Sequence, residues 1–201
     1  MGQIKVEKNA GGIEGLCVIT PVVHGDSRGW FSETFNQRDM ESVDLNYLFV
    51  QDNQSASSKG ILRGLHFQKQ HPQTKLIRVI RGAVWDVTVD LRKASLTFGK
   101  SYGISLTEEN HKQILIPRGF AHGYLVLSDW AEICYKCDDY YHPEDEGGLI
   151  WNDPEVGITW PGVEKSGQGN PMTEEYTVDG QPLRINERDQ NWPCLQEVFT
   201  F

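Results

Sequence analysis

The sequence predicts an all-β protein, a sandwich or barrel with short peripheral helices. Residues 83–91 (AVWDVTVDL) alternate between an apolar set and a more polar set with a period of two, which is typical of a β-strand. Other short apolar segments recur between turn residues at the spacing of a sandwich or barrel. Helical periodicity is weak along the chain, so a helical bundle is not expected.

Seven candidate strands carry this prediction, taken in order along the chain. Each is rich in β-branched, aromatic or other apolar residues. Turn residues such as Arg81-Gly82, Pro117–Gly119 and Ser128-Asp129 separate them. The strands are Leu16–Val22, Leu76–Ile80, Ala83–Leu91, Tyr102–Leu106, Gln113–Ile116, Gly123–Leu127 and Ala131–Cys137.

The remaining segments predict little further regular structure. Asn36–Val43 is expected to form a short helix, and Thr107–Asn110 a short helix or a turn. Lys165–Pro182 is rich in Gly, Gln, Asn and Pro, which indicates a loop or excursion. Too little chain follows it for another domain, so residues 1–201 are expected to form one domain.

The charge of the chain restricts its partners. A net charge of −9 and a pI near 5.1 argue against bulk binding of nucleic acid or of anionic membrane. A few converging arginines remain able to hold a small anionic ligand. No apolar run approaches the roughly 20 residues that span a bilayer, and Met1–Asn9 lacks the apolar stretch of a secretory signal. We therefore expect a cytoplasmic protein.

Four cysteines are present, and two of them, Cys134 and Cys137, form a CxxC pattern. Their segment reads as a strand, on which residues three apart point to opposite faces. No second CxxC completes a set of four metal ligands. The sequence therefore predicts free thiols in a reducing compartment.

Residues 117–122 (PRGFAH) match Pro-x-Gly-x-x-His, a segment typical of cupin-type jelly rolls, also called double-stranded β-helices. The match makes this jelly roll the predicted fold. Metal-binding cupins also carry His-x-His with a following Glu, but His66 is followed by Phe67 and Gln68. Because a catalytic metal usually needs about three protein ligands, we predict no metal and no other cofactor.

Several further segments follow one another in a characteristic order and spacing. They are Gly25–Glu33 (GDSRGWFSE), Gln51–Asn53, Leu62–Gln68 (LRGLHFQ), Pro117–Gly123, Tyr135-Lys136, Trp151–Pro154 and Gly157–Pro161. In these segments the chain resembles the dTDP-4-dehydrorhamnose 3,5-epimerase family. The resemblance covers roughly residues 15–161 and resumes at Ile185–Leu195. It implies a cofactor-independent homodimer that converts dTDP-4-dehydro-6-deoxy-D-glucose to dTDP-4-dehydro-L-rhamnose in dTDP-L-rhamnose biosynthesis.

The family's reaction inverts C3 and C5 of a 4-keto sugar, and His66 matches its base. Histidine titrates near neutrality, so it can accept a proton from carbon next to a ketone. An isolated histidine is more often a core residue with satisfied hydrogen bonds, but the flanking motif favours the base. A carboxylate partner fixes the tautomer of such a base. The resemblance assigns this partner to Asp189, with Arg188 and Asn186 in place of the family's lysine and serine.

The same resemblance assigns the acid and the group at the ketone. Tyr135 matches the family's acid, because a phenol with a pKa near 10 stays neutral at rest and can return a proton. The alternative is a core tyrosine, and Tyr140 and Tyr141 are nearby competitors. Lys75 matches the lysine near the C4 oxygen, where a cation stabilises the enolate. Its alternative is a solvated lysine.

A set of binding residues follows from the resemblance. On an unbroken strand Arg63 points away from His66, unless a bulge intervenes, so its assignment rests on the resemblance alone. Trp30 and Phe31 are candidates to stack on thymine, or else belong to the β-core. Because family dimers share elements, some binding residues are expected to serve the partner's site. The candidate binding residues are Arg28, Trp30, Phe31, Glu33, Gln51, Asn53, Arg63, His122, Glu146 and Arg188.

Three alternative functions stay open at this level. A relative that epimerises a single carbon of a dTDP-4-keto-deoxysugar needs nearly the same residues. A non-catalytic sugar-nucleotide binding module is disfavoured, because His66, Tyr135, Lys75 and Asp189 occur together. A metal-dependent cupin oxygenase is disfavoured by the missing His-x-His.

Overall fold

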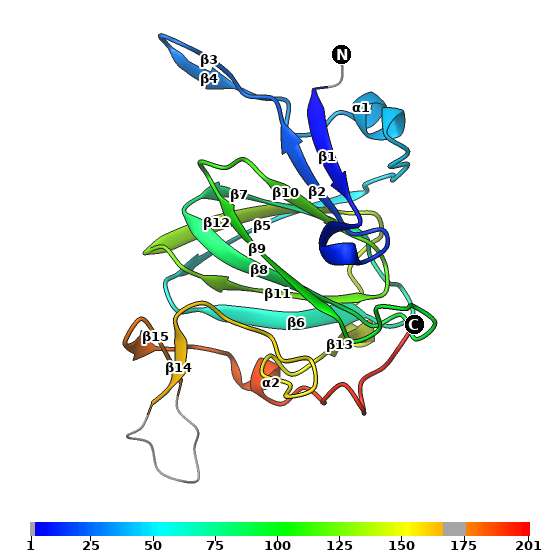
Figure 1. Cartoon of the computed structure of the whole chain (residues 1–201), viewed down its shortest axis with the longest axis vertical. Coiled ribbons are helices and arrows are strands. Elements are labelled where there is room, and N and C mark those ends of the chain that lie inside the picture. The colour runs from blue at the N-terminus through cyan, green and yellow to red at the C-terminus, as the bar shows by residue number, and fades with distance from the viewer. Residues whose placement is uncertain (1–2, 167–175) are drawn as a thin grey trace.

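Two antiparallel β-sheets face each other in the computed structural model, which describes residues 3–166 and 176–201 (Figure 1). The six-stranded sheet has the order β1 (Ile4–Lys8), β2 (Cys17–Pro21), β10 (Gln113–Ile116), β7 (Lys75–Arg81), β12 (Trp130–Cys137) and β5 (Gln51–Ser58). The five-stranded sheet has the order β13 (Glu146–Gly148), β6 (Leu62–Gln68), β11 (Phe120–Val126), β8 (Ala83–Asp90) and β9 (Ser101–Thr107).

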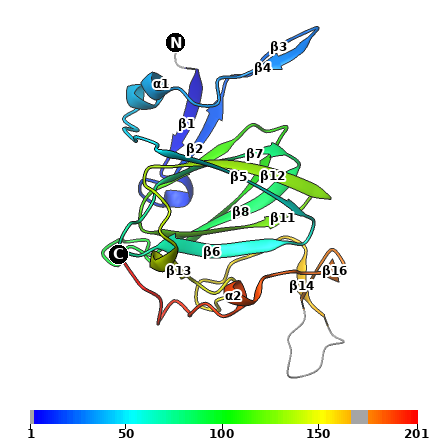
Figure 2. The same ribbon diagram turned by 180° about the vertical axis from the view of Figure 1, so that it is seen from behind.

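Smaller elements decorate the two sheets. A hairpin of β3 and β4 projects from the body next to β1 and α1, and α2 lies directly beneath β6 (Figure 2). The bounds are β3 (His24–Asp26), β4 (Gly29–Phe31), α1 (Gln37–Ser42), α2 (Glu187–Gln190), β14 (Val163–Lys165), β15 (Tyr176–Val178) and β16 (Gln181–Pro182), with 3-10 turns at Ala10–Gly12 and Pro143–Asp145. The prediction of an all-β fold with short peripheral helices is confirmed.

All seven predicted strands are present, Gln113–Ile116 with the predicted bounds and the others with ends shifted by at most three residues. Four strands of the two main sheets were not predicted at all, namely β1, β5, β6 and β13. The polar sequence of β5 (QDNQSASS) has no apolar alternation, and a glycine interrupts β6. These strands form because neighbouring strands satisfy their backbone hydrogen bonds, as β12 does for β5 along its whole length.

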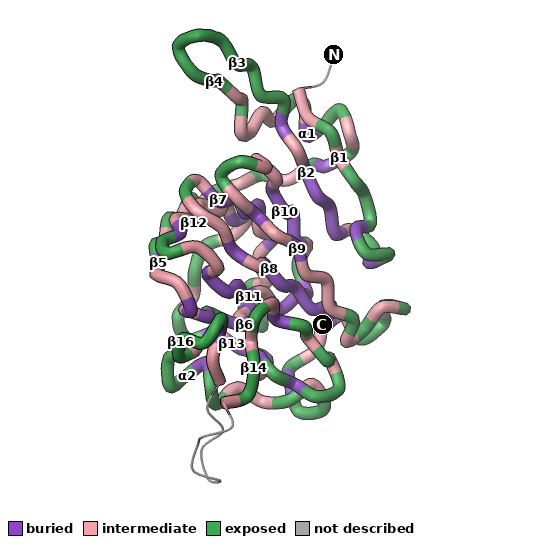
Figure 3. Tube along the Cα trace, turned by 60° about the vertical axis from the view of Figure 1, so that its left-hand side comes forward, coloured by how far each residue is buried: buried purple, intermediate pink, exposed green. Residues whose placement is uncertain are grey.

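The hydrophobic core lies between the two sheets. Ile77 and Val79 on β7, and Ile114 and Ile116 on β10, pack in one buried cluster with side chains of the opposite sheet. Figure 3 shows β10 and β11 buried over most of their length. A second buried cluster covers the other face of the five-stranded sheet, where Trp151, Trp160 and the C-terminal segment pack on it. Both faces of the five-stranded sheet are therefore covered.

The second cluster explains which face of β8 each set of alternating side chains occupies. Trp85, Val87 and Val89 pack in the outer cluster, so the polar set Asp86, Thr88 and Asp90 points into the space between the sheets. All three polar side chains are fully buried. An alternating strand usually turns its polar face to water, whereas here that face lines the interior.

The predicted helical segments also have clear outcomes. The helix near Asn36–Val43 is confirmed as α1, and Asn36 caps its first backbone N–H groups. Thr107–Asn110 forms a turn, in which Asn110 N donates to Thr107 Oγ1. Among the described residues, no helix combines the length and apolar character that crossing a membrane requires.

The prediction that Lys165–Pro182 is a loop is wrong at its two ends. Lys165 ends β14, and residues 176–178 and 181–182 form β15 and β16, so three short strands pair as a small antiparallel sheet. The Gly- and Pro-rich composition concealed strands that are held by pairing and not by an apolar pattern. The middle of this segment, residues 167–175, lies outside the described residues.

Candidate active site

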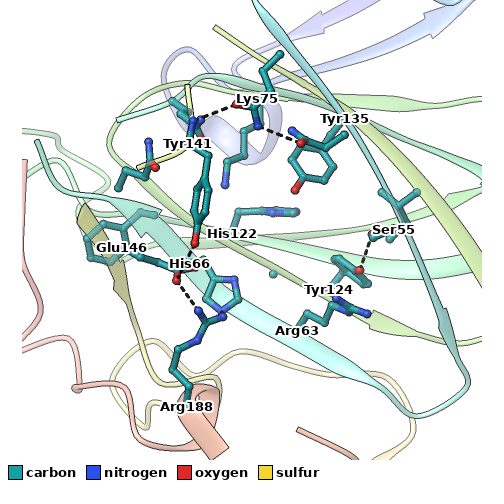
Figure 4. Close-up of a pocket in the computed structure, with 17 residues that line it drawn as sticks. Ser55, Arg63, His66, Lys75, His122, Tyr124, Tyr135, Tyr141, Glu146 and Arg188 are labelled. Atoms are coloured by element: carbon teal, nitrogen blue, oxygen red, sulfur yellow. Dashed lines mark hydrogen bonds and ion pairs between the residues drawn. The ribbon is translucent and has the colours of Figure 1, made fainter. Parts of the chain in front are cut away.

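A pocket of about 340 Å³ opens between the two sheets. Side chains reach into it from β5, β6, β7, β11, β12 and β13, and from α2 (Figure 4). Nine of the fourteen residues proposed from the sequence line it, and Asp189 lies behind one of them, which makes ten. The nine are Gln51, Asn53, Arg63, His66, Lys75, His122, Tyr135, Glu146 and Arg188.

His66 and Asp189 form a hydrogen-bonded pair on one side of the pocket. His66 Nε2 lies 2.8 Å from Asp189 Oδ1, and Gly64 N donates to Asp189 Oδ2 at 3.0 Å. Asp189 is fully buried and is therefore not a solvated surface aspartate. Burial raises the pKa of Asp189, but the bonds from His66, Gly64 and Arg188 outweigh it and lower that pKa.

The ionised carboxylate determines which imidazole nitrogen can act as a base. A carboxylate only accepts hydrogen bonds, so Nε2 of His66 must carry a proton and donate it. Nδ1 is left with the free lone pair. Asn186, the N-cap of α2, accepts from Asp189 N and so fixes the backbone that presents the carboxylate.

Asp189→Asn is expected to lower kcat about 100-fold while KM changes little, because an amide still orients the ring but cannot stabilise the imidazolium. Steady-state kinetics of the purified variant provide the measurement. Asp153→Asn is the matched control, since Asp153 is equally buried and accepts three backbone N–H groups, yet lies outside the pocket. A kcat loss of equal size in both variants would assign Asp189 a purely structural role.

A bulge in β6 brings Arg63 and His66 to the same pocket. The pairing of β6 with β11 shifts register, because His66 lies opposite His122 while Arg63 lies opposite Tyr124. The strands approach closely there, and a Cβ on Gly64 would lie 2.5 Å from the Cα of Gly123. The bulge is the exception that the sequence analysis allowed for, and it explains why Arg63 does not point away from His66. Its guanidinium donates to Ser57 Oγ on β5.

Tyr135 and Lys75 approach the pocket from the six-stranded sheet, opposite His66 and Arg188 (Figure 4). Burial raises the pKa of Tyr135 to about 12, so the phenol stays neutral at physiological pH. Burial lowers the pKa of Lys75, although Cys137, Glu146 and Asp86 oppose this fall. Among the described residues, no side chain makes an ion pair with the Lys75 amine. Lys75 is therefore not an ordinary solvated lysine.

Arg188 connects three groups around His66. Its guanidinium pairs with Glu146, donates from Nε to Asp189 Oδ1 at 3.2 Å, and places Nη2 3.3 Å from His66 Nε2. The hydroxyl of Tyr141 donates a hydrogen bond to Oε2 of Glu146 at 3.4 Å. The guanidinium thus forms one wall of the pocket next to the base, with its charge balanced by two carboxylates.

The other pocket-lining polar groups are held by specific partners. On β5, Gln51 Nε2 donates to Asn53 Oδ1 at 3.0 Å, and Gln51 Oε1 accepts from the backbone N of Tyr141. On β11, His122 Nε2 lies 2.8 Å from Asp86 Oδ2. These bonds fix the side chains before a ligand enters.

Four predicted binding residues do not join this pocket. Trp30 and Phe31 on the β3–β4 hairpin are 64% and 65% exposed, so the alternative that they belong to the β-core is wrong. Arg28 pairs with Asp26 at the hairpin tip, and Glu33 accepts from Asn36. The hairpin projects away from its own sheets, so these residues cannot reach the pocket of the same chain.

Sequence reasoning missed other residues that line the pocket. Tyr141, Tyr124, Ser55 and Gln73 were not proposed, although Tyr141 was noted as a competitor for the acid. Tyr124 exchanges a hydrogen bond with Ser55 across the two sheets at 3.1 Å. The period of two could have found Tyr124, because it lies two residues after His122 on the same face of β11.

The CxxC pattern serves neither a disulfide nor a recognisable metal site. All four cysteines are free, and Cys137 is buried, where Asn53 donates to its sulfur. Over residues 3–166 and 176–201, no three His, Cys, Asp or Glu side chains gather in a way that could hold a metal ion.

The fold and pocket are those of a sugar-nucleotide epimerase of the cupin type, which is an isomerase. A family model described as dTDP-4-dehydrorhamnose 3,5-epimerase matches residues 10–197. The chain is 47% identical to the dTDP-4-dehydrorhamnose 3,5-epimerase of Methanothermobacter thermautotrophicus, over 92% of each chain. The chain therefore belongs to the dTDP-4-dehydrorhamnose 3,5-epimerase family.

Solved structures agree with this assignment. The dTDP-6-deoxy-D-glucose-3,5-epimerase of Legionella pneumophila, in complex with dTDP-4-keto-L-rhamnose, superposes with a TM-score of 0.84 at 40% identity, covering 96% of this chain and 94% of that one. A 3′-monoepimerase from Streptomyces bikiniensis, in complex with dTDP-quinovose, has a TM-score of 0.77 at 30% identity, with 91% and 85% covered. The predicted cupin-type jelly roll is confirmed by these likenesses.

Proposed function

We propose that the chain epimerises C3 and C5 of dTDP-4-dehydro-6-deoxy-D-glucose to give dTDP-4-dehydro-L-rhamnose, within one domain that spans residues 1–201. The observation that carries this proposal is the placement of His66 and Tyr135 on opposite sides of one pocket, with Lys75 on the same side as Tyr135. Inversion at carbon needs a base on one face and an acid on the other. The pocket offers both, together with a cation.

Each inversion is a balanced exchange of protons. Nδ1 of His66 takes the proton from the carbon next to the C4 ketone, and the C–H electrons move into the enolate. Lys75 stabilises the negative oxygen. Tyr135 donates its hydroxyl proton to the opposite face of that carbon, and the ketone forms again. His66 is left protonated and Tyr135 ionised, and exchange with water restores both.

The anchors for the nucleotide lie around this centre. Arg63 and Arg188 present planar sets of donors suited to a diphosphate. Gln51, Asn53, His122 and Glu146 supply hydrogen bonds to sugar and base. Binding of the diphosphate by Arg188 competes with its pairing to Glu146, so this wall is expected to rearrange when substrate enters.

Arg28, Trp30, Phe31 and Glu33 are proposed to complete the pocket of a partner subunit in a homodimer. The exposed aromatic rings and the projection of the hairpin support this, since a lone chain leaves both without a role. Trp30 and Phe31 would stack on the thymine and Arg28 would contact the diphosphate. We also propose a cytoplasmic location, in keeping with the four free thiols.

A mixed dimer tests this sharing. Arg28→Ala and His66→Asn each remove activity at low substrate concentration. If the hairpin serves the partner, a dimer of one variant with the other contains one intact site. Random pairing should then restore about one quarter of wild-type activity. Kinetics after mixing and reassociation measure this, and mixtures no more active than the separate variants would place each hairpin at its own site.

The alternative is epimerisation of one carbon only, which the likeness to a 3′-monoepimerase favours as the second candidate. NMR of the substrate with the wild-type chain in deuterated water decides between them. Deuterium incorporation and inversion at both C3 and C5 are expected. If only one carbon is inverted, the chain is a single-carbon epimerase and the proposed function is wrong. If no reaction takes place, the chain is a non-catalytic binding module.

A further inference from the structure

A second histidine–carboxylate pair lies deeper in the barrel than His66 and Asp189. His122 Nε2 is 2.8 Å from Asp86 Oδ2, and the Asp86 side chain is fully buried on the inward face of β8. An ionised carboxylate accepts but does not donate, so Nε2 of His122 carries the proton. Its Nδ1 remains available on the same pocket-lining ring.

The charge of Asp86 is poorly compensated by its immediate surroundings. Within the described residues, Oδ1 of Asp86 and the neighbouring Oγ1 of Thr88 have no hydrogen-bond partner. Among the described residues, no Lys or Arg forms an ion pair with Asp86, and its hydrogen-bond partner is the His122 ring. Burying an uncompensated carboxylate is costly, so a function is the expected reason for keeping it.

Lys75 is a cation on this side of the pocket. The groups that act on its charge come from both sheets: Cys137 on β12 of its own sheet, and Glu146 on β13 and Asp86 on β8 of the opposite sheet, where Asp86 is buried and bonded to His122 of β11. Glu146 already pairs with Arg188, and Cys137 is a neutral thiol whose pKa burial raises to about 11. Asp86 is thus the carboxylate left to balance Lys75.

We propose that Asp86 is a positioning residue for the epimerisation, which holds Nε2 of His122 and serves as the buried counter-charge of the His122 and Lys75 side of the pocket. This rests on the proposed function and adds a group that never touches substrate. The fixed ring and the retained ammonium then face the ketone oxygen as it gains charge, without reorganisation.

Asp86→Asn separates charge from shape, because asparagine keeps the hydrogen bond to His122 but not the charge. We expect kcat to fall about 10- to 100-fold, less than removal of a direct donor costs. Removing a carboxylate that raises the pKa of Lys75 lets that pKa fall further. The basic limb of the kcat–pH profile should therefore move to lower pH by about one unit.

Asp90→Asn is the matched control. Asp90 lies on the same strand and face and is equally buried, but it pairs with Arg92, Ser95 and Thr97 away from the pocket. That variant should lose stability and keep the wild-type pH profile. An unmoved basic limb in Asp86→Asn, or the same shift in both variants, would overturn the proposal.

A measurement on the wild-type chain covers the case in which Asp86→Asn does not fold. In protein with ¹⁵N-labelled histidine, the His122 signal, assigned with His122→Asn, should show a protonated Nε2. A neutral ring protonated at Nδ1 would overturn the proposal. This NMR readout needs no turnover, so it tests the role of Asp86 independently of the proposed function. The proposed function fails instead if the wild-type chain is inactive on the 4-keto sugar.

Discussion

His66→Asn is expected to reduce turnover by about 10³- to 10⁴-fold, because it removes the group that accepts the proton from carbon. Asparagine keeps a polar side chain next to Asp189, so the buried carboxylate retains a partner and the fold is preserved. Exchange of the C3 and C5 protons with deuterated water, followed by NMR, should be lost together with inversion. Circular dichroism confirms that the variant is folded.

The control for this change is another histidine close to the pocket. His142 stacks on His71 at 4.1 Å and does not line the pocket, so His142→Asn should retain turnover within about twofold. If His66→Asn still exchanged the C3 and C5 protons at the wild-type rate, the base would have to be another group.

Tyr135→Phe is expected to reduce inversion about 100- to 1,000-fold while proton exchange continues within about tenfold of the wild-type rate. The two fall unequally because His66 can still remove a proton and return it, or a deuteron from solvent, to the same face. Only delivery to the opposite face needs the phenol. Since the pKa of Tyr135 is about 12, inversion should not depend on Tyr135 ionisation between pH 6 and about 10.

Deuterium incorporation and product formation, measured in one NMR time course, give the two rates. Tyr102→Phe removes a hydroxyl from a tyrosine that packs partly buried against the same core cluster but lies outside the pocket, so both rates should stay near wild type. A parallel loss of exchange and inversion in Tyr135→Phe would argue for a binding role and against the acid.

The resemblance to a known family found most of the pocket without any structure. Its motifs named His66, Lys75 and Tyr135, and the match of the C-terminal segment named Asp189 across more than one hundred residues of chain. Such motifs work because the chemistry restricts the residue types, and because these segments keep their order along the chain. The same matching could not say which subunit uses Arg28 or Phe31, since a linear motif contains no information on the partner.

The sequence by itself determined the strand pattern and the chemistry-bearing residue types of this protein. The alternation of residues 83–91 fixed a strand because side chains alternate between faces with a period of two. The alternation with a period of two does not determine which face of this strand is exposed to water. That was decided by Trp151, Trp160 and the C-terminal segment, which cover the apolar face and leave Asp86 pointing inward.

Only the tertiary structure decided how Arg63, His66 and Asp189 meet. A bulge in β6 lets Arg63 and His66 reach the same pocket, and β6 and β11 approach there too closely for a side chain at Gly64 or Gly123, a contact between segments far apart in sequence. The four-residue helix α2 is too short to form by local propensity, and it is held by the Asn186 cap and by the bonds of Asp189 to β6. Local patterns specify strands, whereas long-range packing specifies which side chains share a pocket.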